Sequence, residues 1–411
     1  MSTVQLMKDV RQGEALSAWL ATGKSNSTGS CRGTIAGVTG FGKTKVAIEA
    51  LMAFFKTGEL DDWLNTYEQK PVILAVPTEE LRDVTWADEV KKFYGADGFK
   101  MFQKYVLPVC YASLNKVKCN GLLFIGDEIH NMTENNTREF NNGFFVNHVI
   151  GLSATPPDPK RDATKAAIIE ALAPVVYTYT YEDALRDGVI SDFEVYVVPV
   201  MLDYTRKYIE AGKKDNRFWT TESAAYAFAN KQLKKAFAMP PGKAKEAMFK
   251  FASMNRMHLI YKMESKIETA AKLIKHFHVS DPNKRSLIFD ATIARLQKLM
   301  PAELTFHFES KDDSALKKFM SKESRVLGAV KALNEGVNTP DVDYEFILQV
   351  NSNSRHTVQR IGRSIRFKEG HKTRVFILEQ QGTQDVNWVM EAIKDIPPQL
   401  VFRKTLKELL V

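Results

Sequence analysis

The glycine-rich segment at residues 37–44, GVTGFGKT, is the feature that most constrains how this chain can fold. It fits the pattern G-x-x-x-x-G-K-[ST], overlaps the end of the apolar run 33–38 and leads into the helical pattern of residues 43–56. In a strand–loop–helix unit of this kind, backbone N–H groups surround phosphate oxygens at the N-terminus of the helix. The segment therefore predicts a phosphate-binding loop in an α/β domain. A chance glycine turn before a helix is the alternative.

The residue types within this loop suit a nucleoside triphosphate. Lys43 would neutralise charge on the β- and γ-phosphates, and the hydroxyl of Thr44 would reach a magnesium ion. The glycines let the backbone approach the phosphates closely, so the whole loop is a candidate ATP site. The candidate ligands in the loop are Gly37, Thr39, Gly40, Gly42, Lys43 and Thr44.

A pair of adjacent carboxylates follows a second apolar run. Residues 122–125 are Leu-Leu-Phe-Ile, and Asp127 and Glu128 follow after a glycine. Ligands of parallel sheets collect at the carboxyl ends of the strands, which would bring both carboxylates to the phosphate-binding loop. Asp127 could then hold magnesium, and Glu128 could orient and deprotonate an attacking water. An isolated Asp-Glu pair in a loop is usually only solvated, but together with the glycine-rich loop it is the expected partner.

An arginine-rich element lies near the carboxyl end of the chain. Residues 359–366 read QRIGRSIR, and helical spacing places Arg363 and Arg366 on one face, where both can reach one anion. Such arginines stabilise the charge that develops on phosphate oxygens during phosphoryl transfer. Both are therefore candidate catalytic residues, and a solvated basic helix is the alternative.

Alternating strand-like and helical segments indicate two α/β domains. Short apolar runs recur in both halves, separated by helical patterns such as residues 79–93 and 314–320. Residues 1–190 would form one domain and residues 191–411 the other, each with a parallel sheet flanked by helices. A basic helical insertion is expected at about residues 203–280, which lack strand-like runs. The expected strands are residues 33–38, 72–76, 106–111, 122–125, 149–152, 286–289, 305–308, 325–329, 344–350 and 373–378.

Charge is distributed unevenly along the chain. The formal net charge is +8, but residues 1–190 carry 20 basic and 23 acidic side chains, whereas residues 191–411 carry 37 and 26. Residues 201–280 alone hold 16 basic against 7 acidic side chains. A polyanion that rests mainly on the second half would explain this asymmetry, and so would solvated helix faces.

The sequence also excludes several classes of protein. Its three cysteines, Cys31, Cys110 and Cys119, form no C-x-x-C pair, so neither a disulfide framework nor a zinc site is supported. No apolar run approaches the ~18 residues that a membrane span needs, and the first residues do not form a signal peptide. We expect a cytoplasmic protein, in a host cell if a phage encodes it, with no membrane partner.

These motifs, taken in order, resemble those of superfamily 2 helicases of the DEXH type. The chain is most similar to the compact motors that include phage and bacterial branched-DNA repair helicases and restriction-enzyme motor subunits. The resemblance implies two tandem RecA-like domains that bind ATP and Mg²⁺ between them. The matching elements are GFGKT (40–44), AVPTEEL (75–81), DEIH (127–130), GLSATP (151–156), LIF (287–289), LNEGVNTP (333–340) and QRIGRSIR (359–366).

The resemblance further implies roles for residues around the nucleotide. Gln12 matches a glutamine that reads the adenine edge, although an exposed helix residue is the competing interpretation. Gly336 and Asn338 match positions near the nucleotide, and Arg363 and Arg366 would be arginine fingers.

Other matched positions concern coupling and nucleic acid. The residues that would couple the state of ATP to the grip on nucleic acid are His130, Ser153, Thr155 and Gln359. Pro77 and Thr78 resemble a segment that contacts the phosphate backbone, and otherwise form a plain strand-to-helix turn.

The implied function is an ATP-dependent DNA helicase or translocase that moves on or unwinds DNA, branched DNA in particular, in replication, recombination or repair. An RNA helicase is an alternative, because the motifs grip phosphates and do not read a 2′-OH. A motor subunit or nucleotide-gated module that acts with a nuclease or another partner is a further alternative. We expect a monomer, with a replication or recombination protein as a candidate partner.

The basic block with Phe218, Trp219, Tyr226 and Phe228 would bind single-stranded or branched DNA, or else cap the second domain.

Overall fold

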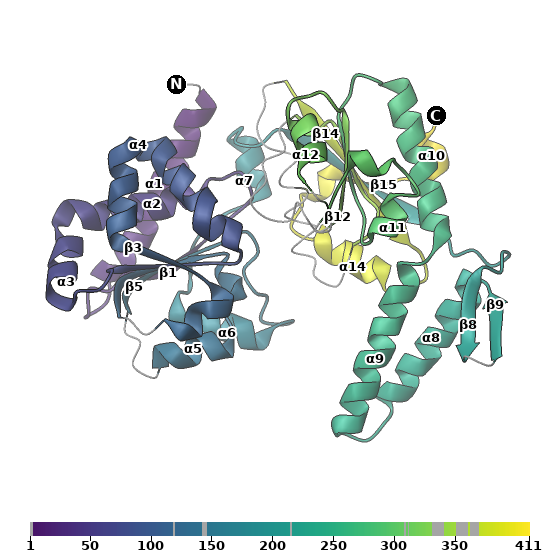
Figure 1. Ribbon diagram of the computed structural model, residues 1–411, viewed down its shortest axis with the longest axis horizontal. Helices are drawn as coiled ribbons and strands as arrows, with labels where there is room; N and C mark the ends of the chain where they lie inside the picture. Colours follow the sequence, from purple (N-terminus) through teal and green to yellow (C-terminus); the bar gives the residue numbers. More distant parts are fainter. Residues whose placement is uncertain are drawn as a thin grey trace. The chain divides into compact units, whose positions relative to one another are not determined.

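The computed structural model divides the chain into two compact units, Met1–Ile190 and Ser191–Val411 (Figure 1). The residues that the structure describes are 3–117, 120–141, 146–213, 216–307, 310, 312–330, 341–350, 361 and 370–411.

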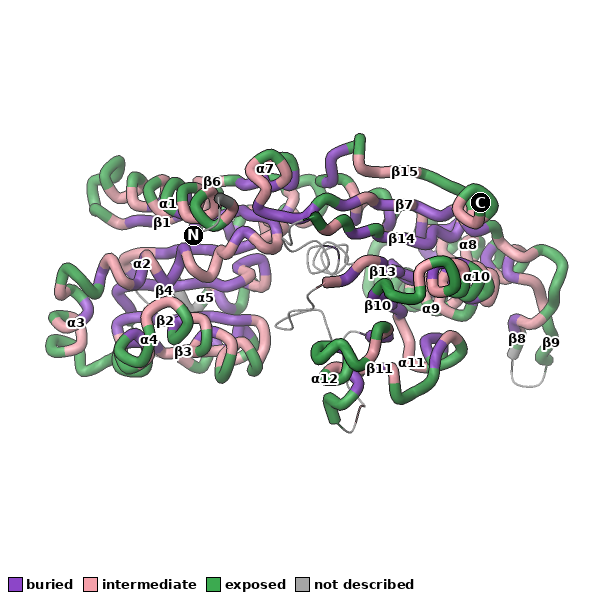
Figure 2. The backbone as a smooth tube through the Cα atoms, turned by 90° about the horizontal axis from the view of Figure 1, so that it is seen from above, coloured by how far each residue is buried: buried purple, intermediate pink, exposed green. Residues whose placement is uncertain are grey.

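The first unit is built on a six-stranded sheet in the order β3-β2-β4-β5-β1-β6, in which all neighbouring strands are parallel. Every residue of β2 and β4 is buried, as expected of a parallel sheet with helices on both faces (Figure 2). The strands are β1 (Arg32–Gly37), β2 (Val72–Val76), β3 (Val106–Cys110), β4 (Gly121–Asp127), β5 (Val146–Ser153) and β6 (Val175–Tyr179).

Helices of the first unit connect these strands and supply the turns of the candidate site. The α-helices are α1 (Thr3–Lys24), α2 (Lys43–Thr57), α3 (Glu59–Tyr67), α4 (Trp86–Tyr105), α5 (Glu134–Asn141), α6 (Ala163–Leu172) and α7 (Tyr181–Arg186). Shorter helical turns are η1 (Leu81–Thr85), η2 (Tyr111–Lys116) and η3 (Ile129–Asn131). Because β1, β2, β4 and β5 run parallel, the glycine-rich loop and the segments after Val76, Asp127 and Ser153 all leave the sheet at one edge.

The second unit contains a seven-stranded sheet in the order β11-β12-β10-β13-β14-β7-β15, again with every neighbouring pair parallel. Its strands are β7 (Asp192–Val200), β10 (Ser286–Phe289), β11 (Thr305–His307), β12 (Val326–Val330), β13 (Tyr344–Ile347), β14 (Lys372–Gln380) and β15 (Val401–Arg403). Its helices are α8 (Glu222–Phe237), α9 (Lys243–Ile260), α10 (Glu264–Ser280), α11 (Ile293–Leu296), α12 (Ser314–Met320), α14 (Asp385–Ala392) and α15 (Leu406–Leu409), with short turns η4 (Ala302–Leu304) and η5 (Pro398–Leu400).

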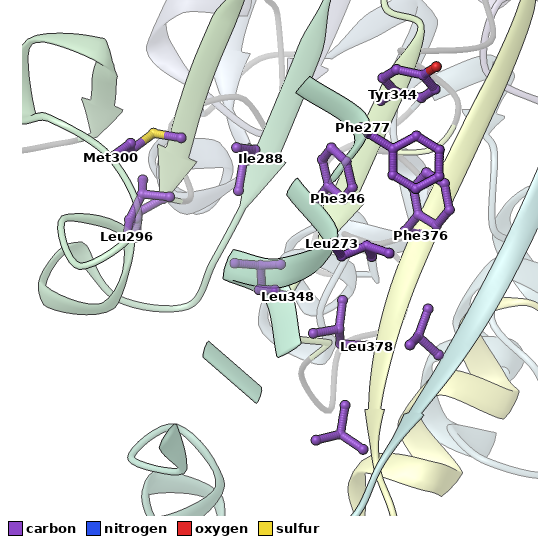
Figure 3. Packing of buried hydrophobic residues seen from close by; sticks show 14 residues of the cluster. Leu273, Phe277, Ile288, Leu296, Met300, Tyr344, Phe346, Leu348, Phe376 and Leu378 are labelled. Atoms are coloured by element: carbon purple, nitrogen blue, oxygen red, sulfur yellow. The ribbon is translucent and has the colours of Figure 1, made fainter. Parts of the chain in front are cut away.

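Aliphatic side chains and a group of aromatic rings fill the core between α10 and this sheet (Figure 3). Phe277 of α10 lies 4.7 Å from Phe376 of β14, measured between ring centroids, and Phe346 of β13 stacks on Phe376 at 5.1 Å. Such ring pairs stabilise a core beyond the area that they bury. The predicted α/β class with two helix-flanked parallel sheets is confirmed.

The prediction of a helical insertion at residues 203–280 is wrong in part. This segment holds α8, α9 and α10, but Ile209–Lys213 and Asn216–Thr220 pair as the antiparallel strands β8 and β9. Each of these strands has only five residues, and charged residues interrupt its apolar ones. Neither therefore shows a strand-like apolar run in the sequence. The pairing joins Glu210 and Arg217 across the hairpin in an ion pair of 2.6 Å.

Two further expectations concern membrane spans and the cysteines. None of the helices in the described ranges is long and apolar enough to cross a membrane. Cys31 and Cys110 are buried free thiols, and burial raises the pKa of both. Cys119 lies outside the described residues.

Candidate active site

The glycine-rich loop joins β1 to α2 and has the geometry of a phosphate cradle. Gly40 and Gly42 have φ of 90° and 88°, in the left-handed region that glycine adopts without steric cost. Lys43 begins α2, and its Nζ donates to the carbonyl of Gly37 at 2.8 Å, so the ammonium group points back over the loop. The Thr39 hydroxyl is buried and has no hydrogen-bond partner among the described residues. A cationic and hydroxyl-lined turn at a helix N-terminus suits phosphate oxygens.

Gln12 lies against this loop. A glutamine that contacts the adenine of a bound nucleotide would have to lie near it. The side chain belongs to α1 and is buried, and its Nε2 donates to the carbonyl of Phe41 at 2.7 Å. A Cβ at position 42 would approach Nε2 to 2.4 Å, so only glycine fits beside the amide. In the described part of the chain, Gln12 Oε1 is buried without a hydrogen-bond partner. The alternative of an exposed helix residue is therefore excluded.

Asp127 ends β4 and is held by an indole. Trp86 Nε1, at the start of α4, donates to Asp127 Oδ2 at 2.9 Å. Burial raises the pKa of Asp127, and the Trp86 hydrogen bond and the positive charge of Lys43 oppose that increase. Lys43 of the loop is therefore close enough to act electrostatically on this carboxylate. Trp86 fixes one carboxylate oxygen of Asp127.

Glu128 occupies a backbone conformation that is unusual for its residue type. Its φ and ψ are 48° and 56°, in the left-handed region that non-glycine residues rarely adopt, and η3 begins at the next residue. Strain of this kind concentrates at functional sites when the surrounding structure holds it in place. Here the turn aims the Glu128 carboxylate toward His130, whose Nδ1 lies 3.4 Å from Glu128 Oε2.

Two facing glycines make room for the side chain that packs beneath this turn. Gly126 of β4 and Gly151 of β5 are register partners, and the side chain of Ile129 fills the space that their missing side chains leave. A Cβ at position 151 would lie 2.7 Å from Ile129 Cδ1 and 2.5 Å from the Thr34 hydroxyl oxygen. Ile129 is fully buried, so its packing fixes the residue directly after Glu128.

The predicted coupling residues of the first unit lie together. His130 Nδ1 is 2.9 Å from Ser153 Oγ, and Ser153 Oγ accepts a hydrogen bond from the Thr155 backbone N–H at 3.1 Å. The Thr155 hydroxyl is buried and has no hydrogen-bond partner in the residues described. This chain of contacts links the turn after β5 to the carboxylate of Glu128.

Pro77 and Thr78 follow β2 at the same edge of the sheet. The Thr78 hydroxyl accepts from the Leu81 backbone N–H at 3.4 Å, so this side chain caps the start of η1. Pro77 lines a cavity of about 280 Å³, which we call the asparagine cavity. The other side chains that define the asparagine cavity include Tyr111, Asn115, Asn131, Asn135 and Asn136.

The structure therefore brings together a large part of the predicted site. The predicted residues that lie in the first unit are Gln12, Gly37, Thr39, Gly40, Gly42, Lys43, Thr44, Pro77, Thr78, Asp127, Glu128, His130, Ser153 and Thr155. Those that lie outside the described residues are Gly336, Asn338, Gln359, Arg363 and Arg366. Sequence reasoning missed Trp86, Tyr111 and Asn131. Trp86 and Tyr111 are distant from Asp127 and Glu128 in the sequence and come near them only in the folded chain. Asn131 is near them in the sequence, but its bond to the Glu128 carbonyl follows no pattern of residues.

The residues present suit magnesium held partly by phosphates. In the described ranges, no three His, Cys, Asp or Glu side chains gather into a metal site. Magnesium in nucleotide enzymes commonly uses one or two carboxylates together with substrate phosphates and water. Asp127 and the hydroxyl of Thr44 are the donors of that kind beside the loop.

Two known protein families match separate parts of the chain. The family described as "Helicase conserved C-terminal domain" matches residues 265–368. The family described as "Type III restriction enzyme, res subunit" matches residues 7–158, which include the glycine-rich loop and both carboxylates.

Individual proteins also resemble the chain over most of its length. The "DNA 3'-5' translocase XPB2" of Sulfurisphaera tokodaii is 25% identical over 393 residues, which are 91% of this chain and 82% of that protein. The DNA-bound type ISP restriction-modification enzyme LlaBIII has a TM-score of 0.54 at 14% identity, covering 96% of this chain and 31% of that chain. Saccharomyces cerevisiae Dbp5 bound to RNA and ADP BeF3 has a TM-score of 0.53 at 12% identity, covering 98% and 93%. At these identities the two solved structures show a common fold.

Proposed function

This chain belongs to the superfamily 2 helicases, and we propose that it is an ATP-dependent DNA helicase or translocase. The observation that carries the proposal is the assembly of Lys43, Asp127 and Glu128 at one edge of the first sheet. We assign residues 1–190 to the ATP-binding RecA-like domain and residues 191–411 to the second RecA-like domain. A monomeric state, a replication or recombination protein as partner and a role on branched DNA in the cytoplasm belong to the same proposal.

Side chains around the loop would divide the work of holding the nucleotide. The Lys43 ammonium, which now donates to the Gly37 carbonyl, would instead donate to phosphate oxygens. The buried Thr39 hydroxyl and Gln12 Oε1 would gain partners from a phosphate and from the adenine edge. Thr44 and Asp127 would hold the magnesium ion. When bound, magnesium ATP supplies the phosphoryl group to be transferred and positive charge beside it.

Hydrolysis would rest on Glu128 and on the arginine element. The Glu128 carboxylate would orient a water molecule and accept its proton at Oε1 or Oε2. Arg363 and Arg366 would stabilise charge on the γ-phosphate oxygens, as the sequence resemblance implies. Through His130, Ser153 and Thr155, the position of Glu128 would depend on the segment that follows β5.

The related translocase supports DNA as the track and a 3′-to-5′ direction of movement. We expect ATPase activity to rise on single-stranded, forked or branched DNA, and strand displacement to require a 3′ single-stranded tail. The test is steady-state ATPase and unwinding on matched DNA and RNA substrates, with Lys43→Ala as the inactive control. Equal activity on RNA would favour the RNA helicase alternative. ATPase that no nucleic acid stimulates would reject the proposal.

A basic arm of the second unit is the best candidate for an additional DNA contact. We define the arm as α8 and α9, which pack against each other (Figure 1). Phe228, Phe237 and Phe251 are each more than 60% exposed, so the arm presents aromatic rings to solvent beside its lysines. Glu246 is an exposed acidic residue of the arm, whereas Glu222 is buried. Basic residues attract phosphates and exposed rings can stack on bases.

The root of the arm is anchored to the second sheet. Tyr226 is buried, and its hydroxyl accepts from the Gln384 backbone N–H at 2.6 Å. Arg295 donates to the carbonyl of Tyr261, at the end of α9, at 2.8 Å and pairs with Asp290 after β10. Of the four aromatic residues that the sequence singled out for DNA binding, Tyr226 therefore caps the domain, while Phe218, Trp219 and Phe228 are exposed. We propose that the exposed part contacts DNA and moves as one body with its domain.

The contribution of the arm can be measured through salt dependence. Neutralising Lys231, Lys234 and Lys235 to Gln should reduce the slope of log K against log salt by up to about 3, because each phosphate contact to duplex DNA contributes about 0.9. The matched control is neutralisation of Lys91, Lys92 and Lys100, which are exposed on α4 of the other unit. An unchanged slope for the arm variant would leave the arm as a structural cap.

A further inference from the structure

Tyr111 places a hydroxyl group in the core close to Asp127 and Glu128. The side chain is 6% exposed and its ring packs in the core of the first unit. Among the described residues its hydroxyl has no hydrogen-bond partner. A Cβ at position 126, directly before Asp127, would lie 3.1 Å from this hydroxyl oxygen. Burial raises the pKa of Tyr111 well above its usual value, and the charges of Asp127 and Glu128 raise it further.

The asparagine cavity is connected to Tyr111 and to Glu128 by side-chain amides. Asn131 Nδ2 donates to the Glu128 carbonyl at 3.1 Å. Asn136 Nδ2 donates to the Tyr111 carbonyl at 3.0 Å, and Asn136 Oδ1 accepts from the Thr133 backbone N–H at 3.0 Å. The four residues that make these contacts, Tyr111, Asn131, Thr133 and Asn136, also line the cavity, and of them Asn131 bonds Glu128 directly. A group that enters the cavity therefore meets side chains that directly hold Tyr111 and Glu128.

We propose that Tyr111 is a positioning residue that links occupancy of the asparagine cavity by nucleic acid to the Glu128 carboxylate. The inference rests on the proposed function, because it requires nucleic acid at this edge of the sheet. The cavity offers amide and hydroxyl groups to sugar or phosphate oxygens, and Pro77 borders it. A shift of η2 that a ligand produces would move the ring of Tyr111. Its O–H would then donate to a carboxylate oxygen of Glu128 and fix the group that orients water.

The unpaired hydroxyl of Tyr111 favours movement of the ring toward a hydrogen-bond acceptor. Leaving a donor unpaired in a core is unfavourable, so the arrangement in which Tyr111 donates to a carboxylate is stabilised once the backbone permits it. Hydrogen bonds to charged groups are stronger than those between neutral groups. The space for the hydroxyl exists because residue 126 is glycine.

Tyr111→Phe removes the hydroxyl and keeps the ring. We expect kcat at saturating single-stranded DNA to fall about tenfold, the size expected for one hydrogen bond to a charged group. The KM for ATP and the DNA concentration that gives half-maximal rate should stay unchanged. Tyr105→Phe is the matched control, because it removes the hydroxyl of another buried tyrosine of the same unit, which bonds Asp61. Asn131→Ala, which cuts the link from the cavity to the Glu128 carbonyl, should likewise lower kcat at saturating DNA and leave the KM for ATP unchanged.

The outcomes separate this proposal from the proposed function. A purely structural tyrosine would leave kcat of the Phe variant unchanged and its melting temperature equal or higher, which would overturn the positioning role. A raised half-saturating DNA concentration with unchanged kcat would overturn it as well, since the residue would then only contact DNA. Wild-type protein whose ATPase no nucleic acid stimulates would overturn the proposed function itself. Should Tyr111→Phe fail to fold, Asn131→Ala decides the question: a kcat at saturating DNA equal to that of the wild type would overturn the link from the cavity to Glu128.

Discussion

Replacing Glu128 with Gln is expected to lower the rate of ATP hydrolysis by about 10²–10⁴-fold, the range for loss of a general base. Gln has nearly the same shape as Glu, so the left-handed turn and the packing of Ile129 should persist. Lys43 and the rest of the loop are unaffected, so nucleotide affinity should change little. The measurements are steady-state ATPase at saturating DNA and binding of a fluorescent ATP analogue.

The control for this substitution is Glu170→Gln. Glu170 is an exposed carboxylate of α6 in the same unit, so it tests whether a loss of negative charge alone changes the rate. Its ATPase should equal that of the wild type. Retention of full activity by Glu128→Gln would show that another group accepts the proton from water, and would remove Glu128 from the catalytic residues.

The sequence was sufficient to predict those parts of the site that depend on local order. The loop at residues 37–44 requires a strand before it and a helix after it, and β1 and α2 stand in those places. Asp127 and Glu128 lie at the carboxyl end of a buried strand because parallel strands deliver their ends to one edge. Gln12 contacts the loop although it lies in the middle of α1, with the second half of that helix between it and β1, and its position followed only from resemblance to a family.

Other features depend on contacts between distant segments, which no local pattern records. Trp86 reaches Asp127 only because α4 packs beside the end of β4. The strand β7 pairs with β14 over nine residues, from Asp192 to Val200, although strands β8 to β13 lie between them along the chain. The strands β6 and β15 were likewise not predicted: both are edge strands, and neither contains a continuous buried run. Periodicity identifies a strand by its own residues, not by the partner that completes it.

A buried ion pair in the second unit provides the other large expected effect. Lys266 of α10 and Asp385, the first residue of α14, are fully buried and bonded to each other. Gln349 accepts from Lys266 Nζ at 3.1 Å and donates to Asp385 Oδ1 at 2.8 Å. The Gln380 backbone N–H, at the end of β14, donates to Asp385 Oδ2 at 2.7 Å. Burial lowers the pKa of Lys266 because the desolvation of its ammonium outweighs the attraction of Asp385.

Removing one member of this pair should destabilise the second unit strongly. Lys266→Met leaves the Asp385 carboxylate buried without its cation, and the expected loss is about 3–5 kcal/mol in the free energy of unfolding. Asp385→Asn should cost a similar amount because it strands the ammonium. The variant that carries both substitutions should recover most of the loss, because neither charge is then left buried alone. The amide oxygen that replaces the carboxylate can still accept from the Gln380 N–H.

Hydrogen exchange of β13 and β14 amides is the suitable measurement, because the two units need not unfold together. Lys298→Met is the matched control: Lys298 pairs with Glu264 at 2.8 Å, but both side chains are at least 40% exposed. Loss of such a surface pair should cost at most about 1 kcal/mol. If Lys266→Met and Lys298→Met increase exchange equally, the buried pair contributes no more than a surface one. If the double variant is as unstable as the two single variants combined, Lys266 and Asp385 act independently, and the network at the ends of β13 and β14 is not a unit.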